Sequence, residues 1–162
     1  MATFSSLKNL VDAVERKVHV PWVMVKGCCN LEVENASTAT YDWTRLGVEN
    51  VAQHPSEADV MIVGGWVDAQ FVEELKSAYF QLSGIRAVIA VGACALSGAP
   101  YAASGEKILK ISDVLPVDVF VPGCPPRPEA VLEAIQALRN KQKPQMDQKK
   151  VIYEALKGPN RN

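Results

Sequence analysis

The chain has 162 residues, 48% of them apolar and 22% charged, which is enough to bury the core of one compact domain. Its formal net charge is -1 and its isoelectric point lies near 6.1, which argues against nucleic acids and anionic membrane surfaces as partners. No apolar run approaches the roughly eighteen residues that a membrane-spanning helix requires, and Lys8, Asp12 and Glu15 interrupt any signal-peptide core. We therefore expect a soluble, cytoplasmic domain.

Apolar spacing along the chain predicts alternating helices and strands. The opening segment repeats with a helical period, which predicts a short amphipathic helix over residues 6–17. Four apolar runs rich in Val, Ile or Met follow, each leading into Gly or Pro-Gly as buried strands do: residues 19–25, 58–63, 86–91 and 117–121. Two further stretches have an apolar face at helical spacing: residues 68–82 and 128–141.

This alternation predicts the fold class. The strands are continuously apolar and are joined by long crossovers, which is typical of a mostly parallel sheet covered by helices on both faces. We expect a doubly wound, flavodoxin-like α/β domain over residues 1–141, with ligand-binding loops at the carboxyl ends of the strands. The polar, basic segment 142–162 is expected to be a tail that becomes ordered on a partner.

All four cysteines come just after predicted strands. Cys28 and Cys29 follow the first strand in VMVKGCCN, Cys94 follows the third in AVGACALSG, and Cys124 follows the fourth in FVPGCPPRPEA. The carboxyl ends of parallel strands share one edge of the sheet, so the four thiols could meet at one site there. Four cysteines in a cytosolic chain of this length are more typical of metal or redox chemistry than of a disulfide scaffold.

The type of ligand follows from the cysteine spacing. A zinc ion holds its ligands about 2.3 Å away and usually takes spaced cysteine pairs, so adjacent cysteines suit it poorly. A 4Fe-4S cluster accepts one thiolate at each iron, so Cys28 and Cys29 could serve two different irons. Three alternatives remain: a zinc ion, buried and inert cysteines, and a catalytic thiol, which would need a base such as His19 or His54.

The cysteine motifs resemble those of a known family. The stretches GCCNLE, GACALSG and VDVFVPGCPPRPEAVLEAI resemble the respiratory complex I subunit that holds the terminal cluster next to quinone, the B or PSST-type subunit, and its relatives among hydrogenase small subunits. The resemblance covers about residues 20–140, and the adjacent cysteines together with VPGCPPRPEA are far more specific than a lone metal-like spacing. It implies that Cys28, Cys29, Cys94 and Cys124 ligate one 4Fe-4S cluster in a flavodoxin-like fold.

The resemblance also implies the setting in which the chain works. That setting is a multisubunit, ion-translocating oxidoreductase, peripheral on the cytoplasmic face of the cell membrane. Its partners would be a large catalytic subunit similar to hydrogenase large subunits, a ferredoxin-like 4Fe-4S subunit and a membrane-arm subunit. The chain would pass electrons to quinone or another acceptor at the interface with the large subunit, without being catalytic alone.

Two departures from the complex I pattern leave the acceptor open. Adjacent cysteines favour the complex I side of the family, because energy-converting hydrogenases have CxxC as their first ligand motif. However, GGWVDAQFVEE stands where a Thr-rich, Met-containing loop is usual, and LSGAPYAASGEK follows Cys94. The alternative is the small subunit of a group 4 energy-converting [NiFe] hydrogenase, or of a related complex that couples ferredoxin, formate, cofactor F420 or sulfur chemistry to ion pumping.

Four polar residues are candidates for tuning the cluster or binding the acceptor. Arg127 would stabilise a negatively charged reduced cluster, with helix capping or an interface ion pair as the alternative. Glu32 matches an acidic residue of the resembled subunit, which suggests proton coupling, although a helix N-terminal carboxylate or a salt bridge would also explain it. Lys26 and Arg45 could act as Arg127 does.

Overall fold

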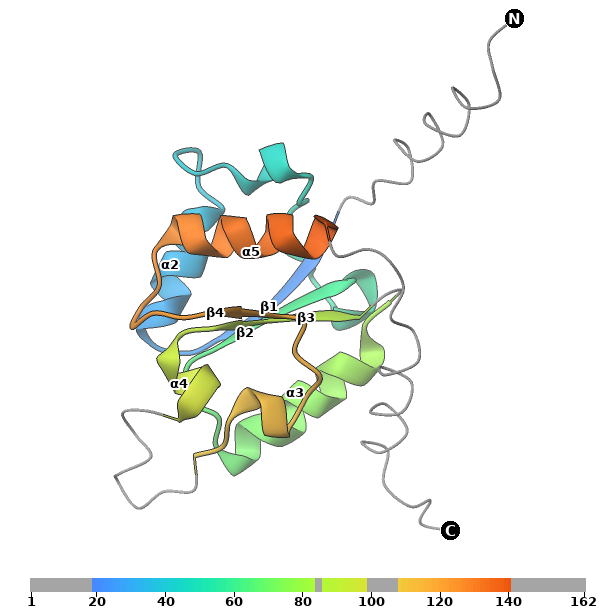
Figure 1. The fold of residues 1–162 in the computed structure, drawn as a ribbon. Helices are drawn as coiled ribbons and strands as arrows, with labels where there is room; N and C mark the ends of the chain where they lie inside the picture. The colour runs from blue at the N-terminus through green and yellow to red at the C-terminus, as the bar shows by residue number, and fades with distance from the viewer. Residues whose placement is uncertain (1–18, 84–85, 99–107, 141–162) are drawn as a thin grey trace, which may run out of the picture.

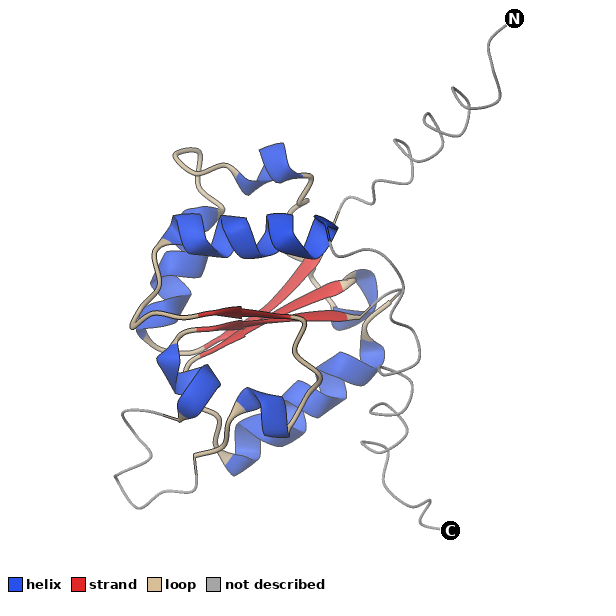
Figure 2. Cartoon of the chain, in the orientation of Figure 1, coloured by secondary structure: helices blue, strands red, loops and turns tan. Residues whose placement is uncertain are grey.

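Four short apolar runs form one parallel sheet, which Figure 2 shows in red. The computed structural model describes residues 19–83, 86–98 and 108–140. Its strands lie in the order β1-β2-β3-β4, and every neighbouring pair is parallel. They span β1 (Pro21–Val25), β2 (Val60–Gly64), β3 (Ala87–Val91) and β4 (Val119–Val121). The prediction of a parallel α/β sheet is therefore confirmed.

Helices cover both faces of this sheet (Figure 1). On one face lie α2 (Cys28–Ala36) and α5 (Pro128–Asn140). On the other lie α3 (Ala69–Gln81), the short α4 (Ala93–Ser97) and the 3-10 helix η4 (Ile111–Asp113). The helices expected over residues 68–82 and 128–141 correspond to α3 and α5, whereas the helix expected over 6–17 and the tail 142–162 lie outside the described residues.

Alternate side chains of each strand pack into two separate cores, which explains the continuous apolarity of the strands. Val60 and Ile62 of β2 pack toward α2 and α5, while Met61 and Val63 pack toward α3 and α4. Side chains of β3 divide between the two cores in the same way. The central strands of the sheet are thus covered on both faces.

A single residue takes the place of a further strand beside β1. Val48 forms a parallel bridge with His19, since His19 N–H donates to Gly47 O and Glu49 N–H donates to His19 O, both at 2.8 Å. Successive residues of a strand turn their backbone groups to opposite sides, and Val20 O accepts from the β2 side, so Val48 lies on the other side of β1. The sheet therefore extends on both sides of β1, with Val48 on one side and β2, β3 and β4 on the other. This is the flavodoxin-like order 2-1-3-4-5 with its second strand reduced to one bridge.

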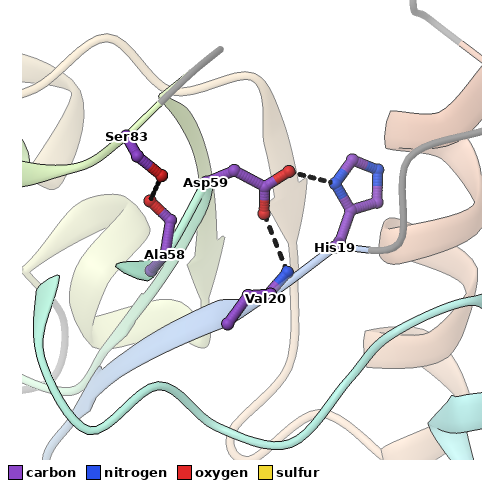
Figure 3. A network of polar contacts seen from close by, with 5 residues as sticks. All are labelled: His19, Val20, Ala58, Asp59 and Ser83. Atoms are coloured by element: carbon purple, nitrogen blue, oxygen red, sulfur yellow. Dashed lines mark hydrogen bonds and ion pairs between the residues drawn. The ribbon is translucent and has the colours of Figure 1, made fainter. Parts of the chain in front are cut away.

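A buried polar contact ties the amino ends of β1 and β2 together (Figure 3). His19, only 3% exposed, places Nδ1 2.9 Å from Asp59 Oδ2, and Asp59 Oδ1 accepts from Val20 N–H at 2.8 Å. Ser83 Oγ donates to the Ala58 carbonyl nearby, at 3.0 Å. These residues stand at the sheet edge opposite the carboxyl ends of the strands.

Candidate metal centre

The four cysteines lie together at the carboxyl edge of the sheet. Cys28 and Cys29 open α2 directly after β1, Cys94 lies in α4 after β3, and Cys124 follows β4. All four are free thiols; Cys29 and Cys94 are buried, whereas Cys28 and Cys124 are exposed. The site therefore has a closed inner side and an open outer side.

The four sulfur atoms are close enough to influence one another's ionisation. The pKa of the Cys29 thiol is raised to about 11, mainly by burial and in smaller part by the neighbouring thiols Cys28, Cys94 and Cys124. Burial also raises the pKa of Cys94, with added contributions from Cys124 and Cys28. Several thiolates held this close together repel one another. A bound cationic centre would relieve that repulsion and stabilise the thiolate forms.

Close backbone packing brings the three cysteine-bearing loops together. A Cβ atom at Gly92 would lie 2.4 Å from Cys29 Sγ, so the turn before Cys94 is filled by the side chain from α2. Gly92 also has φ +88°, a conformation that glycine adopts readily. The same turn is joined to the loop of Cys124, because Ala93 N–H donates to Gly123 O at 2.7 Å.

The donor set fits an iron–sulfur cluster. Within the described ranges, no group of three or more Cys, His, Asp or Glu side chains is arranged to hold a single metal ion, so the group to be considered is the larger 4Fe-4S cluster, which takes one thiolate at each iron. The side chains that meet at this site are four thiols from three loops. Neither histidine is among them, because His19 lies at the opposite edge of the sheet and the exposed His54 is hydrogen-bonded to Ser56. One thiolate at each iron is how 4Fe-4S clusters are held, so the residues present fit that group.

Two of the four polar candidates, Lys26 and Arg127, lie in the loops that carry the cysteines. Lys26 follows β1, and its Nζ lies 3.3 Å from Asp68 Oδ2. Arg127 is exposed three residues after Cys124, and its carbonyl accepts from Ala130 N–H at the start of α5. Among the described side chains, Arg127 takes part in none of the ion pairs.

Glu32 and Arg45 occupy different positions. Glu32 is half-buried on α2, four residues after Cys28 and thus on the same side of that helix. Arg45 is 81% exposed in the 3-10 helix η1 (Trp43–Leu46), where its Nε lies 2.9 Å from Asp42 Oδ2. The next residue after η1, Gly47, accepts a hydrogen bond from His19 N–H, and His19 lies at the edge of the sheet opposite the cysteines. The structure therefore does not bring Arg45 to the cysteine edge.

Sequence reasoning did not find the partners of Lys26. Asp68 and Phe71 come from the loop after β2 and the first turn of α3, more than forty positions further along the chain. The only sequence signal was an Asp three residues before Phe71 at the start of a helical pattern, which indicates an N-cap and nothing about Lys26.

The fold and the site together define a flavodoxin-like α/β protein with four thiols gathered at the carboxyl edge of its sheet. The chain belongs to the family of the NADH ubiquinone oxidoreductase 20 kDa subunit, whose family model matches residues 3–138. This confirms the resemblance on which the sequence analysis depended. Among the described residues, none of the helices combines the length and apolar character needed to cross a bilayer.

Curated relatives of the chain are components of oxidoreductases. The chain is 39% identical to the NADH-quinone oxidoreductase B subunit of Phocaeicola vulgatus over 123 residues, covering 76% of this chain and 62% of that protein. It is 38% identical to the F(420)H(2) dehydrogenase B subunit of Methanosarcina mazei, covering 78% of this chain and 69% of the relative. The NADH-quinone oxidoreductase B subunit of Amoebophilus asiaticus is 39% identical, covering 84% and 85%. The chain thus spans less than two thirds of the Phocaeicola protein but most of the Amoebophilus protein.

Solved structures share the fold. A chain of the membrane-bound sulfane sulfur reductase, an archaeal respiratory membrane complex, superposes with a TM-score of 0.74 at 28% identity, over 91% of this chain and 85% of that one. A chain of an NAD+-reducing [NiFe]-hydrogenase superposes with a TM-score of 0.58 at 21% identity, over 80% and 95%. The second likeness concerns the fold alone.

Proposed function

We propose that this chain is an electron-transfer subunit of a membrane-associated oxidoreductase of the complex I type. It holds one 4Fe-4S cluster on Cys28, Cys29, Cys94 and Cys124 and passes electrons to quinone or another acceptor at the interface with a large subunit. The observation that carries the proposal is the convergence of four thiols, from loops far apart in sequence, on one edge of the sheet.

The chain contributes ligation and an asymmetric environment. A bound cluster supplies a one-electron redox couple. Cys29 and Cys94 close the inner side of the site and keep water from it, while Cys28 and Cys124 face the surface. Electron partners therefore approach from the side of Cys28 and Cys124, and no bond chemistry is needed on this chain.

The exposed face of α2 supports a protein partner over the site. Leu31 is 68% exposed and lies three residues after Cys28, so both project from the same side of the helix. A large aliphatic side chain beside an open site is typical of a protein interface. We assign this face to the large catalytic subunit, with a ferredoxin-like 4Fe-4S subunit as donor and a membrane arm that holds the complex at the cytoplasmic face.

Arg127 is the polar residue best suited to tune the potential. It is exposed, stands three residues after Cys124 and has no ion-pair partner among the described residues, so its charge is available to a negatively charged cluster. Glu32 is assigned to the interface on the Cys28 side of α2, where it could hold a proton near the acceptor. Lys26 is neutralised by Asp68, and Arg45 lies apart, so both have weaker support as tuning residues.

A second candidate function has its own support. The likeness to a chain of the sulfane sulfur reductase, at 28% identity over 91% of this chain, favours a related ion-pumping complex with an acceptor other than quinone. The group 4 energy-converting [NiFe] hydrogenases belong to the same alternative. The potential of the cluster separates these possibilities, because an acceptor of lower potential than quinone requires a more reducing donor.

The test is low-temperature EPR and metal analysis of the anaerobically purified complex. The proposed ferredoxin-like partner has clusters of its own, so the measurement is a difference: the unaltered complex should contain about four irons and four sulfides more than Cys94→Ala and one additional reduced 4Fe-4S signal. Cys94→Ala should abolish this signal, and Ser97→Ala, which changes an exposed residue at the end of the same helix α4, should retain it. One zinc per chain without a paramagnetic cluster, or a normal signal in Cys94→Ala, would refute the proposal.

A further inference from the structure

The loops after β1 and β2 are joined by one side chain next to the cysteine pair. Lys26 Nζ lies 3.9 Å from the ring centroid of Phe71, 5.9 Å from that of Trp66 and 3.3 Å from Asp68 Oδ2. Lys26 and Asp68 are both about one-third exposed, so the ammonium is shielded by two rings and paired with one carboxylate. The contacts are made by residues of the β2–α3 connection and of the first turn of α3, neither of which carries a cysteine.

The carboxylate of Asp68 is itself held in place. Its Oδ1 accepts from Phe71 N–H at 2.8 Å, which caps the amino end of α3, and Trp66 also hydrogen-bonds to this carboxylate. Asp68 is therefore anchored to α3 by a contact that does not involve Lys26. We therefore treat Asp68 as the anchored side of the contact and Lys26, in the loop after β1, as the side that it holds in place.

Backbone packing continues this contact to the residue before Cys28. A Cβ atom at Gly65 would lie 2.5 Å from Lys26 O, and one at Gly27 would lie 3.1 Å from Trp66 Cζ3. Lys26 N–H also donates to Gly64 O at 3.0 Å. The two loops thus touch along their backbones, from the end of the strands to the start of α2.

The start of α2 has no capping group of its own. Its N-cap is Gly27, which offers no side chain, and the first turn contains no acidic residue. Helix starts normally depend on such groups to satisfy and orient the first turn. The first turn of α2 carries Cys28 and Cys29, so their position depends on contacts from outside the helix.

We propose that Lys26, Trp66, Asp68 and Phe71 form a brace that positions the Cys28–Cys29 pair toward Cys94 and Cys124. This inference rests on the proposed function and makes the four residues positioning residues. Because Lys26 and Asp68 carry opposite charges at 3.3 Å, the brace places almost no net charge near the site. It acts through geometry.

A comparison of two variants separates geometry from charge. Lys26→Met keeps the aliphatic stem and removes the ammonium, whereas Asp68→Asn keeps an acceptor for Phe71 N–H and removes the ion pair. A charge effect would shift the cluster potential in opposite directions in the two variants, because one loses a positive and the other a negative charge. A loss of positioning would instead give the same kind of change in Lys26→Met and in Asp68→Asn. Each variant would show a broadened or split EPR signal and would lose iron to a chelator faster.

The experiment uses the purified complex, with Lys76→Met as the matched control. Lys76 is 34% exposed, close to the 31% of Lys26, and pairs with Glu73 on α3, away from the β1 loop. We expect both brace variants to lose the iron of this chain's cluster faster than the control. The increase should be about tenfold in Lys26→Met, which loses the cation–π contact and the ion pair, and about twofold to fivefold in Asp68→Asn, which loses the ion pair alone. Equal rates and EPR signals in all three variants would overturn the brace, and so would opposite potential shifts with unchanged line shapes.

A separate readout covers the case in which no cluster is found. Loss of the proposed function is seen in the unaltered complex as an absent cluster. The brace is then tested by alkylation of Cys29, which should be several-fold faster in Lys26→Met and Asp68→Asn than in Lys76→Met, because a loosened first turn exposes the buried thiol. Phe71→Leu, which keeps apolar volume but removes the ring, should behave as Lys26→Met does. Unchanged alkylation rates would also overturn the brace.

Discussion

The imidazole Nδ1 of His19 lies 2.9 Å from Oδ2 of Asp59, and this pair joins the segments that lead into β1 and β2 (Figure 3). Asp59 also accepts from Val20 N–H and, through its own backbone, bonds to both neighbouring strands. The entry of the chain into the sheet is thus fixed at the edge opposite the cysteines. Stability and the thiol site are therefore separable by mutation.

His19→Ala should reduce the free energy of unfolding by about 2–4 kcal/mol, because it leaves the Asp59 carboxylate without its buried partner. Denaturant titration measures this. His54→Ala removes an exposed ring bonded to Ser56 and should cost about 1 kcal/mol or less. Equal losses in the two variants would contradict the role assigned to the pair.

In the cluster-free chain, the exposed thiols Cys28 and Cys124 should react with iodoacetamide before Cys94 and Cys29. Burial raises the pKa of Cys29 to about 11, so at neutral pH its reactive thiolate is scarce and its alkylation should accelerate most between pH 8 and pH 11. Peptide mass spectrometry after timed labelling gives the order. Labelling of Cys29 as fast as Cys124 at pH 7 would rule this out.

Gly92→Ala should prevent the cysteines from closing on their ligand, since its Cβ would meet Cys29 Sγ at 2.4 Å. The positive φ of +88° adds a cost of about 1–3 kcal/mol to folding. Gly47→Ala is the control, because Gly47 also has a positive φ of +74° but lies beside His19. Both variants should be less stable, and only Gly92→Ala should lack iron. Full iron content in Gly92→Ala would show that this contact is dispensable.

Asp68 should give a measurable acid dependence of stability. Hydrogen bonding from Phe71 N–H, with the interaction of Lys26 added, holds the pKa of this carboxyl below its ordinary value. Because the pKa of Asp68 is lower in the folded than in the unfolded chain, its ionised carboxylate stabilises the fold at pH values above the ordinary pKa of about 3.9. This stabilisation is lost as the pH falls below that value. The stability difference between the native chain and Asp68→Asn should therefore shrink from pH 6 to pH 3. A constant difference would disprove the assignment.

Leu31→Gln should weaken assembly without affecting the fold. Leu31 is 68% exposed, so the free energy of unfolding should change by about 0.5 kcal/mol or less. At a protein interface the same change removes an apolar contact, so partner subunits should dissociate from affinity-purified chain at lower salt or detergent. Val51→Gln, an exposed apolar residue before η2 (Pro55–Glu57), is the control. Unchanged recovery of partners in Leu31→Gln would exclude this face as an interface.

The elements that the sequence predicts correctly are those whose apolar pattern is long or continuous. β2 and β3 are apolar throughout because both faces are covered, and α3 carries a clear apolar face. In contrast, α2 begins at Cys28 without a polar cap, α4 is five residues long, and Val48 represents a strand with one bridge. None of these leaves a periodic signal.

The site is predictable to the extent that topology determines it. Parallel strands bring the residues after their carboxyl ends together, which is why cysteines at positions 28, 29, 94 and 124 could be expected to meet. The contact between Lys26 and Phe71 depends on how two loops pack against each other. Such packing has no signature in either segment alone, so the supporting residues emerge only from the structure.

The unequal exposure of the four thiols sets an order for biogenesis. Cys29 and Cys94 lie beneath the surface, and only the flank with Cys28 and Cys124 is open. Iron and sulfide can therefore enter from one direction, which is also the direction from which a neighbouring subunit would arrive. Under the proposed function we therefore expect the cluster to be loaded before docking, because a subunit bound on this flank would cover the empty site.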